Sequence, residues 1–160
     1  MGLGRLFIAL GMALMVMTEA SAIDFLHGQG PVSNVYIAEW SKLRHSADMG
    51  DVNAQFQLPN FYYEPPEHSS LPKSYLKAAK YYRLAAEQNH APSQHNLGVL
   101  LLKGQGVERD WVEAYAWFSL AADQGYRAAQ DAIAALTPRL NDAEKQRAEQ
   151  LKNGFKTRMH

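Results

Sequence analysis

Small and aromatic side chains recur at helical spacing in the middle of the chain. One stripe follows the order i, i+3, i+4, i+7, which places its members on one face of a helix, and it consists of Ala78, Tyr81, Tyr82 and Ala85. The stripe returns 36 residues later as Ala114, Trp117, Phe118 and Ala121. Aromatic rings supply buried area and alanines let a neighbouring helix come close, so each stripe predicts a helix that is buried on one side.

These stripes belong to a longer internal repeat. Residues 75–89 align with residues 111–125 at an offset of 36, and both stretches contain the run Leu-Ala-Ala-x-Gln. A more degenerate copy aligns upstream at an offset of 39, where Tyr36 falls on Tyr75. Three copies at nearly constant spacing predict a repeat architecture, in which each unit buries its apolar face against its neighbours.

Turn and start signals recur with the repeat. The same turn is occupied in the three copies by Gly50, Asn89 and Gly125. Glycine and asparagine tolerate the left-handed backbone that ends many helices. Ser74 and Asp110 mark helix starts 36 residues apart, since their side chains can accept hydrogen bonds from the first turn. Glu113 follows Asp110 by three residues, which predicts a reciprocal acidic capping pair.

The whole pattern predicts an all-α chain. The expected helices are Ser33–Met49, Val52–Tyr63, Ser74–Gln88, Ala91–Lys103, Asp110–Gln124, Arg127–Leu136 and Asn141–Lys156. The first of them is expected to cap the N-terminal end of a domain that spans residues 33–157. Within this domain the repeat units are expected at about 52–88, 91–124 and 127–156. Residues 23–32 contain two glycines and a proline and are expected to form a flexible lead.

The second copy carries the residues that point to a known family. It resembles the Sel1-like repeat in the aromatic pair and the Ala-Ala-x-Gln-Gly ending of Ala114–Gly125, in Leu97-Gly98, and in the connector Gly104–Asp110. This family is a relative of the tetratricopeptide repeat, and the resemblance covers about residues 47–136. It implies a short right-handed superhelix, or solenoid, of two and a half to three helix pairs with capping helices at its ends. Pro59 stands where the second copy has Gly98, so the first unit is expected to be bent or shortened.

The resemblance implies a non-catalytic scaffold that binds other proteins. Bacterial members with signal peptides typically assemble complexes of the cell envelope or of signalling. Some cysteine-rich relatives are linked to penicillin binding, which leaves an envelope hydrolase or a protein that binds peptidoglycan or penicillin as the alternative. This chain contains no cysteine.

The first 22 residues have the three-part pattern of a secretory signal. Arg5 precedes an apolar run of twelve residues, Leu6–Met17, and small residues stand at Ala20 and Ala22. Twelve apolar residues are fewer than the roughly 20 that a membrane-spanning helix needs. We therefore expect cleavage after Ala22 and a periplasmic or secreted protein, with an uncleaved membrane anchor as the less favoured interpretation.

Composition and charge exclude several other classes. Without Arg5 and Glu19, the chain keeps fifteen basic and fifteen acidic residues out of sixteen of each. A nucleic-acid-binding protein usually has a clustered basic excess, so no nucleic-acid partner is expected. The absence of cysteine also means that no disulfide can stabilise an exported domain of this size. The core must therefore hold by apolar packing.

Catalytic and metal-binding interpretations find little support. Ser70-Leu-Pro-Lys73 matches the serine-x-x-lysine of penicillin-recognising enzymes, but the companion motifs are missing and Pro72 breaks the helix that this chemistry needs. The six histidines are scattered and lack partners at the usual zinc spacings, so no metal or other cofactor is expected. The aromatic stripes are interpreted as core, whereas the burial of Trp40 and Trp111 is left open, since either could be partly exposed.

The inner face of the superhelix is the predicted site for a protein partner. In related solenoids the first helix of each pair lines this face. Side chains that lie off the core stripe of those helices are Gln57, Asn60, Tyr63, His95, Asn96, Val99 and Lys103. They offer the aromatic, apolar and charged contacts that protein interfaces use. The alternative is that they are ordinary solvated residues.

Overall fold

The structure is a computed structural model that describes residues 31–65, 71 and 73–159. This part of the chain consists of α3 (Pro31–Asp48), α4 (Val52–Tyr63), α5 (Tyr75–Glu87), α6 (Ala91–Lys103), α7 (Trp111–Asp123), α8 (Arg127–Leu136), the 3₁₀ turn η1 (Thr137–Arg139) and α9 (Asp142–Arg158). No strand occurs in these residues, so the all-α prediction is confirmed. The predicted signal segment lies outside the described residues, as does most of the predicted lead. Helix α3 begins two residues before its expected start.

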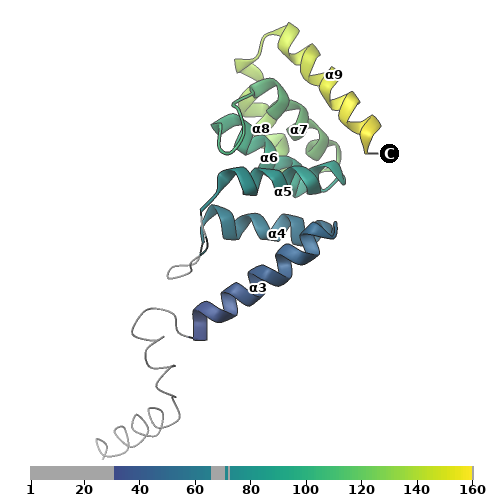
Figure 1. Ribbon diagram of the computed structural model, residues 1–160. Helices are drawn as coiled ribbons and strands as arrows, with labels where there is room; N and C mark the ends of the chain where they lie inside the picture. The colour runs from purple at the N-terminus through teal and green to yellow at the C-terminus, as the bar shows by residue number, and fades with distance from the viewer. Residues whose placement is uncertain (1–30, 66–70, 72, 160) are drawn as a thin grey trace, which may run out of the picture.

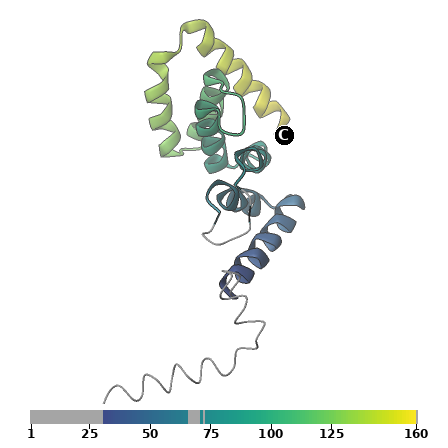
Figure 2. The ribbon, with the colours of Figure 1, turned by 60° about the vertical axis from the view of Figure 1, so that its left-hand side comes forward.

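Consecutive helices pack against one another to form a solenoid. Helix α4 packs on α3 and α5, α6 packs on α5 and α7, and α8 packs on the other side of α7. Figures 1 and 2 show this progression from α3 at one end to α9 at the other. Helix α9 also packs on α7, so α7 contacts three helices and lies at the centre of the C-terminal half.

Side-chain caps fix where the helices begin. The Ser74 hydroxyl accepts a hydrogen bond from the backbone N–H of Lys77, and the Asp110 carboxylate accepts from the N–H groups of the residues two and three positions on. Asn141 and Glu144 form a complete capping box at the start of α9. These contacts account for the agreement between the predicted and observed helix starts.

The predicted acidic capping pair of α7 is only half correct. Asp110 caps the helix, but the Glu113 carboxylate does not return to the backbone of Asp110. Its Oε1 accepts hydrogen bonds from Nη1 of Arg83 at 3.0 Å and from Nε1 of Trp117 at 3.1 Å. Glu113 therefore ties α5 to α7, because a buried indole N–H needs an acceptor and an arginine reaches the same oxygen.

The three equivalent turns share one backbone conformation. The φ angles are +95° at Gly50, +63° at Asn89 and +81° at Gly125, all in the left-handed region. The residue after each of them donates its N–H to the carbonyl five positions earlier, as in a Schellman ending. The helix ends at Gly50, Asn89 and Gly125 therefore share one geometry, although only two of the three residues are glycine.

The aromatic stripes form the core. Tyr81, Tyr82, Trp117 and Phe118 are each at most 6% exposed, which agrees with their interpretation as buried residues. They divide between a smaller cluster under α3, α4 and α5 and a larger one that runs from α5 to α9. Pro59 is buried within α4, and α4 keeps the length predicted for it, so the proline does not shorten the helix.

Buried glutamines connect successive helices in both repeats. The side-chain amide of Gln55 donates to the carbonyl of Ala47 at 3.0 Å, and its oxygen accepts from Gln88 at 2.8 Å. Gln94 repeats this role in the next unit, and its oxygen accepts from Gln124 at 2.8 Å. Each buried glutamine therefore links the helix before its own to the helix after it, and it satisfies polar groups that would otherwise be buried unpaired.

Candidate functional site

Two hollows open beside α6, and we name them by their chemistry. The first, the polar hollow, has a volume of about 160 Å³ and is lined by Asn60, Tyr63, Tyr82, Asn96, Val99 and Leu100. It lies between α4 and α6, with Tyr82 contributed by α5. Two amides and two phenols give it donors and acceptors, while its apolar part comes from α6. Four of the seven residues predicted for the partner-binding face meet here: Asn60, Tyr63, Asn96 and Val99.

Hydrogen bonds and rings hold the walls of the polar hollow. The Tyr63 hydroxyl donates to Oε1 of Gln105 at 2.6 Å, and its ring meets Tyr75 edge-on with 4.9 Å between centroids. The Tyr82 hydroxyl donates a long bond of 3.4 Å to Oδ1 of Asn60. Burial raises the pKa of Tyr82, and hydrogen bonding to Asn96 offsets part of the increase. Tyr82 therefore remains a neutral phenol that can donate a hydrogen bond at neutral pH.

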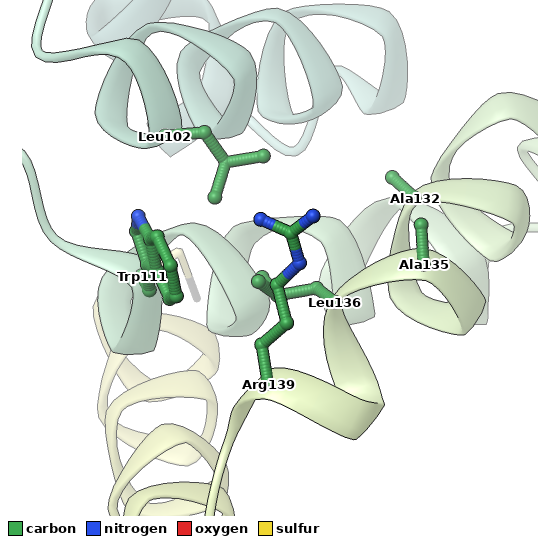
Figure 3. A pocket seen from close by; sticks show the side chains of 6 residues that line it. All are labelled: Leu102, Trp111, Ala132, Ala135, Leu136 and Arg139. Atoms are coloured by element: carbon green, nitrogen blue, oxygen red, sulfur yellow. The ribbon is translucent and has the colours of Figure 1, made fainter.

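The second hollow, the apolar hollow, lies between α6 and α8. It has a volume of about 280 Å³ and is lined by Leu102, Trp111, Ala132, Ala135, Leu136 and Arg139. Figure 3 shows the Arg139 side chain extending from the turn after α8 toward Leu102, with Trp111 on one side and the two alanines on the other. The guanidinium carbon of Arg139 lies 5.7 Å from the centre of the Trp111 ring, a cation–π contact that orients it. The hollow therefore has five apolar walls and one cation.

The other three residues predicted for the binding face do not line either hollow. Gln57 and Lys103 are exposed on α4 and α6. The His95 ring is half-buried and packs against the rings of Phe118 and Tyr126, with centroids 5.5 and 5.4 Å away. His95 thus joins α6 to α7 and to the start of α8.

Reasoning from the sequence misses the apolar hollow. Its leucines, alanines and tryptophan have the composition of a core, and α8 is not considered as part of the face. One signal was available, since the offset of 36 carries Asn96 and Val99 of the polar hollow onto Ala132 and Ala135. Trp111, whose burial the sequence left open, is half-buried, and its ring forms a wall of this hollow.

Other chemistries gain no support from the described residues. Within them, no three His, Asp or Glu side chains gather closely enough to hold a metal ion. Ser70 and Pro72 of the serine-x-x-lysine sequence lie outside the described residues, and Lys73 is exposed. In the same part of the chain no helix has both the length and the apolar character needed to cross a bilayer.

Comparisons with known proteins identify the repeat as a Sel1 repeat. The family model described as Sel1 repeat matches residues 53–90 and 91–126. A protective antigen of uropathogenic Escherichia coli strains, whose crystal structure displays an SLR fold, is 29% identical with a TM-score of 0.70 over 87% of this chain and 29% of that chain. A Sel1 repeat protein from Oxalobacter formigenes is 32% identical with a TM-score of 0.54, over 59% of this chain and 26% of that one.

A curated relative extends the likeness to animals. DAP3-binding cell death enhancer 1 of Rattus norvegicus is 35% identical over 96 residues, which are 60% of this chain and 18% of that protein. The chain spans less than a third of the length of each of these three proteins. The two matched units are α4–α5 and α6–α7, the helix pairs whose turns, glutamines and buried stripes repeat. Residues 53–126 of this chain therefore form two consecutive Sel1-like repeats.

Proposed function

We propose that this domain binds a partner protein along the surface formed by α4, α6 and α8. Sel1 repeat proteins are generally scaffolds for protein–protein interaction. The observation that carries the proposal is the pair of hollows on either side of α6, because they provide two concave contact sites next to each other on the solenoid. Protein interfaces rely on such pockets for a few anchoring side chains of the partner.

The size of the hollows favours side chains over a free small molecule. Sites for drug-sized ligands and cofactors usually measure roughly 300–1,000 Å³. The volumes of about 160 and 280 Å³ are below that range. Each hollow suits a single inserted side chain, which is the unit of recognition in a protein interface.

Crosslinking from defined positions tests the binding surface. A photo-crosslinking residue is placed at Val99, on the wall of the polar hollow, in the full chain expressed in its native host. The matched control is Leu76, which is 70% exposed on α5 and lines neither hollow. We expect discrete protein adducts from position 99 and none from position 76. Adducts from position 76 alone would move the binding surface elsewhere, and the absence of adducts from both would contradict the scaffold role.

We further propose that the protein acts outside the cytoplasm, in the periplasm or after secretion. The support is the sequence of residues 1–22, with Arg5, the apolar run and the small residues before Ile23. The test is to fractionate host cells and determine the N-terminal residue of the recovered protein by mass spectrometry. A chain that begins at Ile23 in the exported fraction is expected. A chain recovered from the cytoplasm with its first residues intact would contradict export.

A further inference from the structure

The two hollows are successive copies of one site. Shifting the six lining residues of the polar hollow along the chain by the repeat offsets of 39 and 36 brings four of them onto lining residues of the apolar hollow. The pairs are Tyr63 with Leu102, Asn96 with Ala132, Val99 with Ala135, and Leu100 with Leu136. Because the repeat places equivalent side chains at equivalent points of the solenoid, the same concavity recurs one repeat further along the surface.

The chemistry of the site changes between the two copies. Asn96 and Tyr63 are replaced by Ala132 and Leu102, so the amide and the hydroxyl are lost and the volume rises from about 160 to about 280 Å³. A smaller residue also replaces Val99. The first copy can therefore hydrogen-bond a polar side chain, whereas the second offers a larger apolar space in which an unpaired polar group would be costly.

Arg139 is the single charged group of the apolar hollow. It is exposed and makes no ion pair with the residues that the structure describes. Its repeat counterpart, at an offset of 36, is Lys103, which immediately follows Leu102 of the same hollow and is also without an ion pair there. The Trp111 ring orients the guanidinium at the mouth. A guanidinium held in this way presents paired N–H donors that match a carboxylate.

We propose that the two hollows are consecutive side-chain subsites for one extended segment of the partner protein. The proposal rests on the partner-binding function above and names the chemistry of that partner. The apolar hollow takes an aliphatic or aromatic side chain, and a residue adjacent to it in the partner supplies a carboxylate to Arg139. The occupant is thus a peptide segment with an apolar residue beside an acidic one.

A matched set of peptides tests this chemistry on the full chain. The probes are fluorescein-labelled dodecapeptides of Gly, Ser and Asn, acetylated and amidated at their ends, with one central pair that is Leu-Glu, Leu-Gln, Leu-Lys or Ser-Glu. Fluorescence anisotropy measures their dissociation constants at low ionic strength. We expect Leu-Glu to bind about tenfold more tightly than Leu-Lys and Ser-Glu, since a charged pair and a buried leucine each contribute on that scale.

Variants of the chain assign the effect to the apolar hollow. Arg139→Gln should remove the preference for Leu-Glu over Leu-Gln, and Ala135→Leu should fill the hollow and remove the preference for Leu over Ser. The controls are Arg147→Gln, an exposed arginine on α9, and Ala134→Leu, the exposed neighbour of Ala135 on α8. Both controls should bind like the wild type. Thermal melts verify that all four variants fold.

The possible outcomes separate this inference from the scaffold role. If Arg139→Gln leaves the ratio of Leu-Glu to Leu-Gln unchanged, or if no peptide binds while position 99 crosslinks a protein, the subsite proposal is wrong and the scaffold role stands. If neither peptides nor crosslinks appear, both fail. A chain that dimerises through Ala135, and becomes monomeric as Ala135→Leu, would make a second copy of the chain the occupant and would also overturn the proposal.

Discussion

In the first repeat, tyrosines occupy the buried positions that Trp117 and Phe118 occupy in the second. Tyr81 and Tyr82 are 4% and 6% exposed, against 1% and 0% for their counterparts. The helix caps at Ser74 and Asp110, the turns at Asn89 and Gly125 and the glutamine bonds are equivalent in the two units. The two units therefore compare tyrosine with tryptophan and phenylalanine at equivalent buried positions.

The tyrosines of the first unit anchor their polar ends at its edges. Tyr81 donates a hydrogen bond of 2.7 Å to Oδ1 of Asp48 and stacks on Tyr62, with 6.1 Å between centroids. Asp48 is also paired with Arg44 at 3.7 Å. Burial, followed by the hydrogen bond and the charge of Asp48, raises the pKa of Tyr81 to about 12. The first unit thus couples its core to a charged group at its rim.

The rings of the second unit are almost completely buried. Trp117 stacks on Phe155 of α9 with 4.2 Å between centroids, and Phe118 lies so close to α6 that a Cβ at Gly98 would be 2.6 Å from its ring. Helix α9 adds this contact only on the side of the second unit, through α7. We therefore expect the second unit, whose apolar rings are covered by α9, to contribute more to the free energy of unfolding than the first.

The largest effect is expected at the stacked tryptophan. Trp117→Ala should lower the free energy of unfolding by about 3–5 kcal/mol, because a large buried ring leaves a cavity and α9 loses its contact. The matched control is Trp111→Ala, since this ring is only half-buried at the apolar hollow and should cost clearly less. Urea denaturation of both variants measures the difference. Equal losses would contradict the assignment of these two faces.

The hydrogen bonds of the buried glutamines are expected to contribute equally to the free energy of unfolding in both units. Gln94→Leu removes the bond to the Ala86 carbonyl and the bond from Gln124, and it should cost about 1–3 kcal/mol because polar groups lose partners in a buried place. Gln55→Leu should cost a similar amount. Gln130→Leu, at the exposed third position, should change stability by less than about 0.5 kcal/mol. Denaturation midpoints that rank Gln130 with the other two would show that burial does not decide the effect.

Much of this fold follows from the sequence because its signals are local. The period of the stripes, the caps at Ser74 and Asn141 and the left-handed turns fix the helices with little help from distant residues. The role of Glu113 could not be inferred in the same way, because Arg83 reaches it from another helix. The order of the helices was predictable, but the side chains that cross between them were not.

The candidate site was predictable in part for the same reason. Asn60, Tyr63, Asn96 and Val99 line one hollow because their spacing places them off the core stripe of α4 and α6. The apolar hollow has no such signal within a single helix, since it needs small residues on α8 and a tryptophan from α7 to meet. Composition alone assigns such residues to the core, and only packing shows that they leave a space.

A smaller effect on stability is expected at Gly98, which aligns with Pro59 of the first unit. Gly98→Ala forces Phe118 to move, which costs about 1–3 kcal/mol, but alanine favours the helix by about 0.5–1 kcal/mol, so a net loss of up to about 2.5 kcal/mol is expected. Gly154→Ala is the control, because nothing lies within 4 Å of its added Cβ and the helix should be stabilised. Thermal melts that show stabilisation in both variants would mean that the ring yields without strain.

The smallest loss of stability at neutral pH is expected at Tyr81, whose hydrogen bond to Asp48 occurs only in the first unit. Tyr81→Phe loses the hydrogen bond to Asp48 and should cost about 1 kcal/mol at pH 7. The pKa of Tyr81 is raised to about 12, so between pH 10 and 12 the unfolded chain loses this proton while the folded chain keeps it, and the stability that it provides declines as pH rises. The variant should therefore lose less stability over that range than the wild type.

Phenolate absorbance measures the ionisation of Tyr81 directly. Asp48→Asn should allow the Tyr81 phenol to ionise at lower pH, because it removes the neighbouring charge but keeps an acceptor. An alkaline transition unchanged by Tyr81→Phe would locate the pH dependence in other groups and remove the distinction drawn between the two units.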